Sequence, residues 1–266
     1  MVALDTTQTN RTMNTHKHEF ALYNLAISEK AAHLKPGELL KIDDKDLCHR
    51  ILHVLRIKPN ESLILFNQQH NARCIFKSTE KKNILVLEIV SFQANNALHP
   101  AITFCLPLLK REAFQESIYA LTELGANSIQ PIISNLSRRN WGDTREYERA
   151  ERIVHAAAEQ SKNFAFPTIS STANLKTFLE STSKKQTIIF FDPEGQPLME
   201  TIKQLQQKTI KELILIVGPE ADLTPDEKEI LKRHTVIFCS LTPTVLRAQQ
   251  AVAISLGSFR SLLNPQ

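Results

Sequence analysis

The stretch LILIVGPEADLTPDE, residues 213–227, indicates how the C-terminal part of the chain folds. Its first five residues are apolar on both faces, which is typical of a parallel-sheet strand that helices cover on both sides. Its last four have the pattern of a capping box, with Thr224 as N-cap, Pro225 at the first helical position and Glu227 reaching back. The stretch therefore predicts a strand, a short loop and a helix. Ligands collect at the carboxyl ends of strands in open α/β sheets, and a plain turn would give the same pattern.

The same alternation of strand and helix recurs throughout residues 99–266. Four further apolar segments predict strands, at residues 101–109, 128–134, 187–195 and 235–244. Three more segments predict helices, at residues 110–125, 145–160 and 245–263. In the first of these helices Phe114, Ile118 and Leu121 share one face, and Gly125 closes the helix. Five apolar strands that alternate with helices predict an α/β domain with a mostly parallel sheet.

The residues before 93–99 have a different pattern, and we expect the chain to divide there. Four short β-rich runs are separated by turn residues, at 37–43, 62–67, 72–78 and 84–92. Between the first two runs, residues 44–56 predict one helix capped by Asp43 or Asp44. Several short strands with one helix suggest a small β-barrel. The polar residues 1–16 are expected to be disordered.

Composition excludes several classes of protein. The chain has 266 residues and a net charge of +4, which is compatible with a polyanionic partner. Its four cysteines are scattered through apolar stretches, which predicts reduced core residues in a cytoplasmic protein. No apolar run is long enough to span a membrane, and the polar N-terminus does not resemble a secretory signal. We therefore expect no contact with a membrane.

Common cofactor and hydrolase motifs are also missing from the sequence. The chain has six glycines and neither a G-x-G-x-x-G nor a Walker A motif, which argues against a Rossmann site or a P-loop. It has no G-x-S-x-G elbow. His49 and His53 are four residues apart in the predicted helix, but no third ligand is evident. We therefore expect no bound metal.

Five segments in register resemble the RsmE-type 16S rRNA uridine-N3 methyltransferases of the SPOUT superfamily. They are HRILHVLRIKPNESLILFN, ALTELGANSIQPIIS, AAAEQS, LILIVGPEADLTPDE and VLRAQQAVA, within residues 17–263. The resemblance implies a PUA-like β-barrel that binds RNA at residues 17–92 and a SPOUT domain with a C-terminal trefoil knot at 99–266. It further implies a homodimer formed through the SPOUT domain, S-adenosylmethionine as cofactor, and methylation at N3 of a specific uridine in 16S rRNA of the small ribosomal subunit.

The resemblance also implies the site residues. Three loops, at 191–195, 218–222 and 241–247, would hold the cofactor in the knot. The cofactor-binding residues carried over are Phe191, Asp192, Pro193, Gly218, Pro219, Glu220, Leu241 and Leu246. The candidate catalytic residues are Arg247, Glu220 and Glu123. A carboxylate would take the uracil N3 proton, and Arg247 would hold a phosphate or polarise a carbonyl. Arg247 in a structural salt bridge and Glu123 as a helix-end pair are the alternatives.

Basic clusters outside the predicted cores are candidate RNA contacts, with a solvated basic face as the alternative. They are Arg50, Arg56, Lys110, Arg111, Arg138 and Arg139. Trp141, the only tryptophan, stands beside two of these arginines and could stack on a base.

The chain departs from the family at positions that bear on the chemistry. Ala221 and Asp222 replace two glycines, Thr242-Pro243-Thr244 replaces Gly-Pro-Arg, Ala248-Gln249-Gln250 replaces Thr-Glu-Thr, and Tyr119-Ala120 replaces Gln-Lys. We expect Ala221 and Asp222 to weaken cofactor binding through steric crowding and repulsion of the methionine carboxylate. Two alternatives to the family activity stay open: an rRNA-binding homologue with weak or no catalysis, and a SPOUT methyltransferase acting on another RNA nucleotide.

Overall fold

The computed structural model describes residues 19–81, 83–137, 141–183 and 186–263. Two predictions lie outside the described residues: the disorder of residues 1–16, and the RNA contacts of Arg138 and Arg139.

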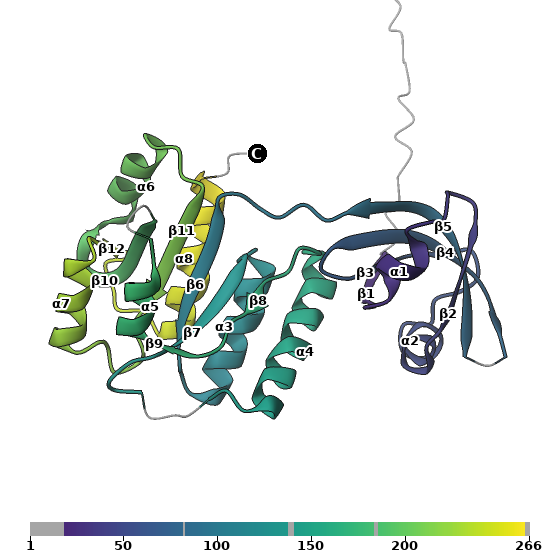
Figure 1. Cartoon of the computed structure of the whole chain (residues 1–266), viewed down its shortest axis with the longest axis horizontal. Coiled ribbons are helices and arrows are strands. Elements are labelled where there is room, and N and C mark those ends of the chain that lie inside the picture. The colour runs from purple at the N-terminus through teal and green to yellow at the C-terminus, as the bar shows by residue number, and fades with distance from the viewer. Residues whose placement is uncertain (1–18, 82, 138–140, 184–185, 264–266) are drawn as a thin grey trace, which may run out of the picture.

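The N-terminal part contains a five-stranded mixed sheet (Figure 1). Its order is β1-β3-β4-β5-β2, with bounds β1 Phe20–Tyr23, β2 Leu39–Asp43, β3 Ser62–Phe66, β4 His70–Glu80 and β5 Ile84–Ala94. β1 runs parallel to β3, and the other pairs are antiparallel. The four predicted strands are confirmed, whereas the four-residue β1 was not predicted. A PUA-like barrel at 17–92 stays a prediction.

The helix predicted at residues 44–56 is only partly correct. Asp44 caps α2 (Lys45–His49), because its side chain accepts a hydrogen bond from Leu47 N at 2.9 Å. The chain then continues as a π-helix, η1 (Arg50–Val54), in which the Leu55 N–H reaches Arg50 O. Arg56 lies beyond the helix in a left-handed conformation with φ 54°. A short helix that was not predicted, α1 (Ile27–Ala31), precedes β2.

The C-terminal part contains a seven-stranded sheet in which every strand pair is parallel. Its order is β12-β10-β11-β6-β7-β8, with β9 also on β7. The bounds are β6 Ala101–Pro107, β7 Ser128–Ile133, β8 Thr168–Ile169, β9 Ala173–Asn174, β10 Thr187–Pro197, β11 Glu212–Val217 and β12 Ile237–Ser240. The five predicted strands and the α/β class are confirmed, and β8 and β9 are short additions.

Six helices accompany this sheet in the described part of the chain. They are α3 Arg111–Glu123, α4 Thr144–Ser161, α5 Leu175–Ser181, α6 Leu198–Gln206, α7 Pro225–Arg233 and α8 Ala248–Leu263. Helices α5 and α6 were not predicted. Gly125 follows α3 with φ 82°, as expected for a helix-closing glycine. The last helix begins at Ala248 rather than at residue 245, so that Leu246 and Arg247 belong to the preceding loop.

Strand β11 shows why its residues are apolar on both faces. Leu213, Leu215 and Val217 belong to a core with buried side chains of α3, α4, α6 and α8. The alternate residues Ile214 and Ile216 belong to a second core with α5 and α7. Because successive strand side chains point to opposite faces, both faces of this sheet are buried. A third core lies almost wholly within the N-terminal sheet and its helices.

Helix α4 joins the two sheets (Figure 1). Glu159 of α4 accepts a hydrogen bond from Tyr23 N of β1 at 2.9 Å and pairs with the Arg50 guanidinium at 3.0 Å. His155, one turn earlier, stacks on the Tyr23 ring with 3.7 Å between centroids. These contacts fix the N-terminal sheet against the α/β part.

Arg260 locks the far ends of α3 and α8 together. Its guanidinium donates to Gly125 O at 2.6 and 3.0 Å, to Pro100 O at 2.7 Å and to Asn127 Oδ1 at 2.6 Å. Burial lowers the pKa of Arg260 to about 10. The group stays protonated at neutral pH, and its donors are matched by neutral oxygens at the end of α3 and the start of β6.

Candidate functional site

A cleft of about 790 Å³ opens at the carboxyl ends of β11 and β12 and beside the middle of β10. It is lined by an irregular segment of β10 and by the loops after β11 and β12, together with the starts of α3 and α8. The lining residues are Lys110, Ala113, Phe191, Asp192, Pro193, Val217, Gly218, Pro219, Glu220, Asp222, Leu241, Thr242, Thr244, Val245, Leu246, Arg247, Ala248, Gln249 and Ala251. Its volume falls in the usual range for small-molecule sites.

Residues 192–195 form a bulge within β10, because the register with β12 shifts between Phe191 and Gln196, and this β10 bulge is pressed against β12. Phe191 is buried and packs edge-on against Phe259 of α8, with 5.8 Å between centroids. Asp192 is also buried, and its Oδ1 accepts the Glu194 N–H at 2.8 Å. A Cβ at Gly195 would overlap the backbone of β12, so only glycine fits there.

The loop after β11 is held to the start of α3. Glu220 lies at the surface of the cleft, and its Oε1 accepts a hydrogen bond from Lys110 N at 3.1 Å. A turn closes behind it, because Asp222 N donates to Pro219 O at 2.9 Å. Asp222 has φ 64°, in the left-handed region that asparagine and aspartate tolerate better than other side chains.

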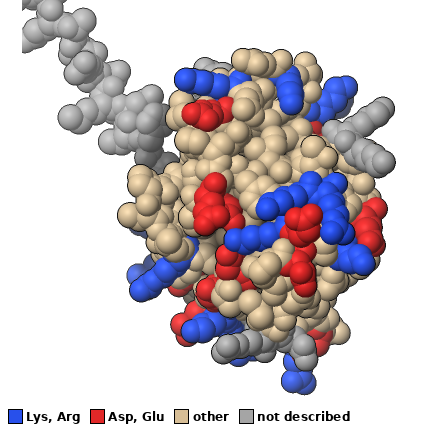
Figure 2. Space-filling model, turned by 90° about the vertical axis from the view of Figure 1, so that its left-hand side faces the viewer, with Lys and Arg blue, Asp and Glu red and all other residues tan. Residues whose placement is uncertain are grey.

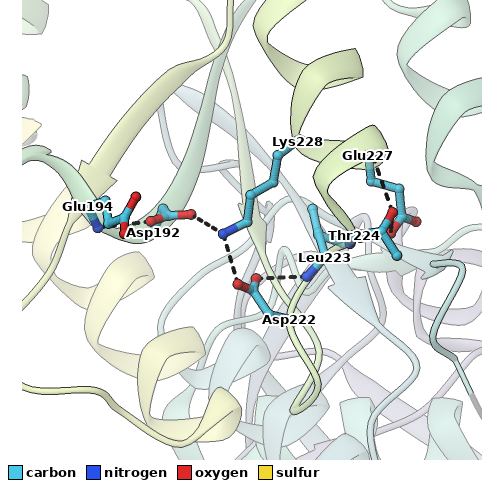
Figure 3. Close-up of polar contacts among 7 residues, drawn as sticks. All are labelled: Asp192, Glu194, Asp222, Leu223, Thr224, Glu227 and Lys228. Carbon is cyan, nitrogen blue, oxygen red and sulfur yellow. Dashed lines mark hydrogen bonds and ion pairs between the residues drawn. The ribbon is translucent and has the colours of Figure 1, made fainter.

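An ion triad connects this loop to the β10 bulge (Figure 3). Lys228 of α7 places its Nζ 2.7 Å from Asp192 Oδ2 and 2.8 Å from Asp222 Oδ2. The other Asp222 oxygen accepts the Leu223 N–H at 2.7 Å. Partial burial lowers the pKa of Lys228, but the hydrogen bonds and charges of the two aspartates outweigh it and the net pKa is raised. Lys228 therefore stays charged.

The predicted capping box is present at the start of α7 (Figure 3). Thr224 Oγ1 accepts the Glu227 N–H, and Glu227 Oε2 accepts the Thr224 N–H at 2.9 Å. The buried Glu227 has a further role, because its Oε1 accepts the Asn135 N–H after β7 at 2.8 Å. The box thus fixes both the helix start and a neighbouring loop.

The loop after β12 has fewer contacts. Thr242 Oγ1 donates to Thr244 O at 2.7 Å within the loop. The Val245 side chain is 83% exposed at the rim of the cleft. Arg247 is exposed and lines the cleft, and its guanidinium has no hydrogen-bond or ion-pair partner among the described residues. A structural salt bridge, the alternative reading of Arg247, is therefore absent from this part of the chain.

The structure gathers most of the predicted site residues around the cleft. All eight predicted cofactor-binding residues line it, as does Arg247. Glu123 does not, because it is exposed at the last residue of α3, about 15 Å along the helix from Ala113, which lines the cleft. Within one chain Glu123 therefore cannot serve a ligand in this cleft. The functional roles of the gathered residues stay predictions.

The predicted RNA contacts are spread over different settings. Lys110 lines the cleft and Arg111 follows it at the start of α3, both exposed. Arg56 is exposed on the N-terminal part. Arg50 instead pairs with Glu159, so that the junction between the two sheets occupies its guanidinium. Trp141 packs against Phe114 and Tyr147, with 5.2 and 4.5 Å between centroids, which restricts the ring's access to a base.

Charge is mixed on the end of the molecule formed by the α/β part, which lies at the left in Figure 1. Figure 2 shows this face, and lysine and arginine side chains lie among aspartates and glutamates.

Sequence reasoning missed Lys228 and did not distinguish the two substituted positions of the β11 loop. The left-handed conformation belongs to Asp222, and Ala221 is not among the residues with positive φ. The Asp222 charge, which we expected to repel the methionine carboxylate, is paired with Lys228. Asp222 and Lys228 lie on either side of the capping box in the sequence. Because the box sets the first turn of α7 beside the loop, this spacing could have predicted that the two side chains meet.

Other features of the described residues bear on the excluded classes. They contain no cluster of three or more histidine, cysteine, aspartate or glutamate side chains that could hold a metal ion. None of the described helices has the length and apolar character needed to cross a bilayer. All four cysteines are buried, as predicted, and burial raises the pKa of Cys74 to about 12.

Comparison with known proteins places this architecture among RNA-modifying enzymes. Residues 96–260 match the family model described as RNA methyltransferase domain. The chain is 25% identical over 218 residues to the ribosomal RNA small subunit methyltransferase E of Rickettsia conorii, covering 80% of this chain and 86% of the relative. It is 26% identical over 218 residues to the protein of the same name from Synechocystis sp., covering 81% and 71%.

Solved structures show the same fold. The crystal structure of a ribosomal RNA small subunit methyltransferase E from Neisseria gonorrhoeae, bound to S-adenosyl methionine, superposes with a TM-score of 0.77 at 21% identity, covering 92% of this chain and 98% of that one. The putative methyltransferase Lpg2936 from Legionella pneumophila, in complex with the same cofactor, superposes with a TM-score of 0.75 at 20% identity, covering 93% and 98%.

Proposed function

The chain belongs to the RNA methyltransferase domain family, and we propose that it methylates N3 of a specific uridine in 16S rRNA of the small ribosomal subunit, using S-adenosylmethionine. The observation that carries the proposal is the cleft formed by the β10 bulge and the loops after β11 and β12 in a chain of this family. The names of the relatives, ribosomal RNA small subunit methyltransferase E, support the choice of substrate.

The residues of the cleft fit S-adenosylmethionine. Apolar side chains, Phe191, Val217, Leu241 and Leu246 among them, offer a surface for an adenine ring. Asp192 and Asp222 supply negative charge for a cationic sulfonium and ammonium. When bound, the cofactor supplies an activated methyl group, so that the chain has to align the acceptor nitrogen and remove its proton.

The chain offers two groups for that task. Glu220 is exposed at the cleft with its orientation fixed by Lys110 N, and we assign it the uracil N3 proton. Arg247, whose guanidinium is available, would hold a phosphate or polarise a uracil carbonyl as negative charge develops on the ring. Glu123 drops out of this scheme within one chain because of its distance from the cleft.

The proposal includes an architecture for the whole enzyme. We propose a PUA-like RNA-binding unit at 17–92, a SPOUT domain at 99–266 with its C-terminal loops knotted, a homodimer through the SPOUT domain, and action in the cytoplasm. The hydrophobic core that is made only of residues from the N-terminal part supports the division into two units. The exposed Val245 beside the cleft supports a partner subunit close to the site.

The second candidate is an rRNA-binding homologue that has lost catalysis. It is favoured by the family departures that lie in the cleft, among them Asp222, Thr242 and Thr244. The third candidate, a SPOUT methyltransferase for another RNA nucleotide, would keep the same cofactor cleft.

Mass spectrometry of small-subunit rRNA from a strain that lacks the gene separates the three candidates. Loss of one 3-methyluridine is the expected result, and it should return when the gene is restored. Unchanged rRNA with retained binding of the protein to the small subunit supports the inactive homologue. Loss of a different methylated nucleotide supports the third candidate.

A further inference from the structure

The Asp192–Lys228–Asp222 triad joins the β10 bulge to the β11 loop. β10 and β11 pair in parallel up to Phe191 opposite Val217, so that Asp192, the first residue of the bulge, and Gly218, the first residue of the loop, follow side by side. Both aspartates line the cleft, whereas Lys228 contacts them from α7 and is not among the lining residues. The ammonium therefore holds the bulge and the loop together from behind the cleft wall.

The two ion pairs differ in their surroundings. The Asp192 side chain is 5% exposed, and the Asp222 side chain is 57% exposed. Removing the partner of a buried carboxylate is strongly destabilising, whereas an exposed pair contributes little to stability. The Lys228–Asp222 contact is thus a weak stabiliser, and its effect falls mainly on where the β11 loop lies over the cleft.

Charge balance gives Lys228 a second effect. Two carboxylates that share one ammonium would repel each other without it. The Asp222 side chain also stands over Gly218, because its Oδ1 would be only 3.3 Å from a Cβ at that glycine. If Asp222 swings away from Asp192, the wall of the cleft at Gly218 moves with it.

We propose that Lys228 is a positioning residue of the cofactor cleft, which acts by holding Asp222 and Asp192 in the places that S-adenosylmethionine binding requires. This inference rests on the proposed function. It reverses the expectation from sequence that Asp222 weakens cofactor binding.

The test is calorimetric titration of the full chain with S-adenosylmethionine. Asp222→Asn removes the charge and keeps a side chain that tolerates the left-handed backbone and accepts from Leu223 N. Lys228→Met removes the ammonium and keeps the length, and Lys228→Arg restores a cation. Asp226→Asn and Lys232→Met are matched controls on exposed positions of α7. Thermal unfolding of each variant separates a loss of folding from a loss of binding.

We expect Asp222→Asn to weaken binding about threefold without a change in thermal stability. Lys228→Met should weaken it at least about tenfold, and Lys228→Arg should recover most of the loss. In the absence of cofactor, amide hydrogen exchange in residues 218–222 should be faster in Asp222→Asn and Lys228→Met than in wild type.

Two results would overturn the inference separately from the proposed function. If wild type binds S-adenosylmethionine and the Asp222→Asn and Lys228→Met variants bind it equally well, Lys228 does not position the cleft. If exchange in residues 218–222 is the same in all variants, the loop is not held by the triad. A wild-type chain that binds no S-adenosylmethionine overturns the proposed function, and the cofactor role of Lys228 with it.

Discussion

The loops after β11 and β12 leave strands on the two sides of β10, yet the two loops are held very differently. The β11 loop bonds to α3 through Glu220 and to α7 through Asp222 and Thr224. Lys228, the α7 partner of Asp222, also pairs with Asp192 of β10. In the β12 loop, the side-chain hydrogen bond among described residues runs within the loop itself, from Thr242 to Thr244. The exposed Val245 and Arg247 follow.

This difference indicates that the two loops have different roles at the same cleft. A loop whose polar groups are satisfied by its own chain is preorganised and loses little freedom when a ligand binds. A loop whose arginine has no partner in the described chain retains that group for a ligand. The β11 loop should therefore govern stability and shape, and the β12 loop should govern reaction with RNA.

The largest expected effect is that of Arg247→Ala, which tests the β12 side of the comparison. Because the guanidinium makes no hydrogen bond or ion pair with a described residue, its removal should leave thermal stability unchanged. Loss of a group that stabilises developing charge should lower kcat/KM for methyl transfer at least about 100-fold. The measurement is transfer of labelled methyl groups to unmethylated small subunits, with Arg233→Ala on α7 as the control. A clear fall in the melting temperature would instead make Arg247 structural.

Glu227→Ala tests the β11 side, where the effect should appear in stability. The substitution removes the capping box and leaves the Asn135 N–H without its acceptor. We expect the free energy of unfolding to fall by about 2–3 kcal/mol. Urea unfolding followed by circular dichroism measures it, and Glu229→Ala, exposed on the same helix, should change it by less than about 0.5 kcal/mol. Equal effects of the two substitutions would remove the distinction between the loops.

Lys110 connects the β11 loop with the expected RNA surface. Its backbone N–H orients Glu220 of that loop, and the residue also lines the cleft. Affinity for small-subunit rRNA should fall steeply with salt, because phosphate contacts release counterions. Lys110→Ala should reduce the slope of log K against log salt by about 1. Filter binding at several salt concentrations measures the slope, with Lys203→Ala on α6 as the control. If the RNA affinity of the wild-type chain did not change with salt, that result would contradict contacts between these basic side chains and the RNA phosphates.

Ala221→Gly should have the smallest effect and sharpens the assignment of strain within the β11 loop. Because the left-handed residue is Asp222, glycine at 221 relieves no strain and adds freedom to the unfolded chain. We expect a loss of stability below about 1 kcal/mol, with affinity for S-adenosylmethionine unchanged. A gain in stability or affinity would indicate that the backbone at Ala221 is strained.

Much of the fold follows from local pattern. Leu213–Val217 could be assigned because a strand buried on both faces is apolar throughout, and Thr224 and Glu227 because capping is a contact between near neighbours. Helix α6 has Leu198, Ile202 and Leu205 at helical spacing, and this signal was available but was not used. The π-helical turn at Arg50–Val54 has no comparable local signature.

The candidate site was predictable only where the family resemblance or chain proximity supplied the contact. The cleft-lining loops could be placed in this way, but the Asp192–Lys228 pair spans 36 residues and depends on how α7 packs. Arg50 was expected to contact RNA, whereas its carboxylate partner is 109 residues away on α4. The sequence around a charged side chain does not indicate which distant residue it pairs with.

The lock at Arg260 sets a limit on how the chain can change in length. Helices α3 and α8 both begin at the cleft, and the guanidinium joins their far ends through Gly125 O. One residue inserted within α3 would turn Gly125 by about 100° and move it about 1.5 Å along the axis, away from Arg260. Substitutions on the outer faces of these helices are compatible with the lock, whereas insertions and deletions are not. Insertions and deletions among homologues of this chain should therefore occur in the loops and not within either helix.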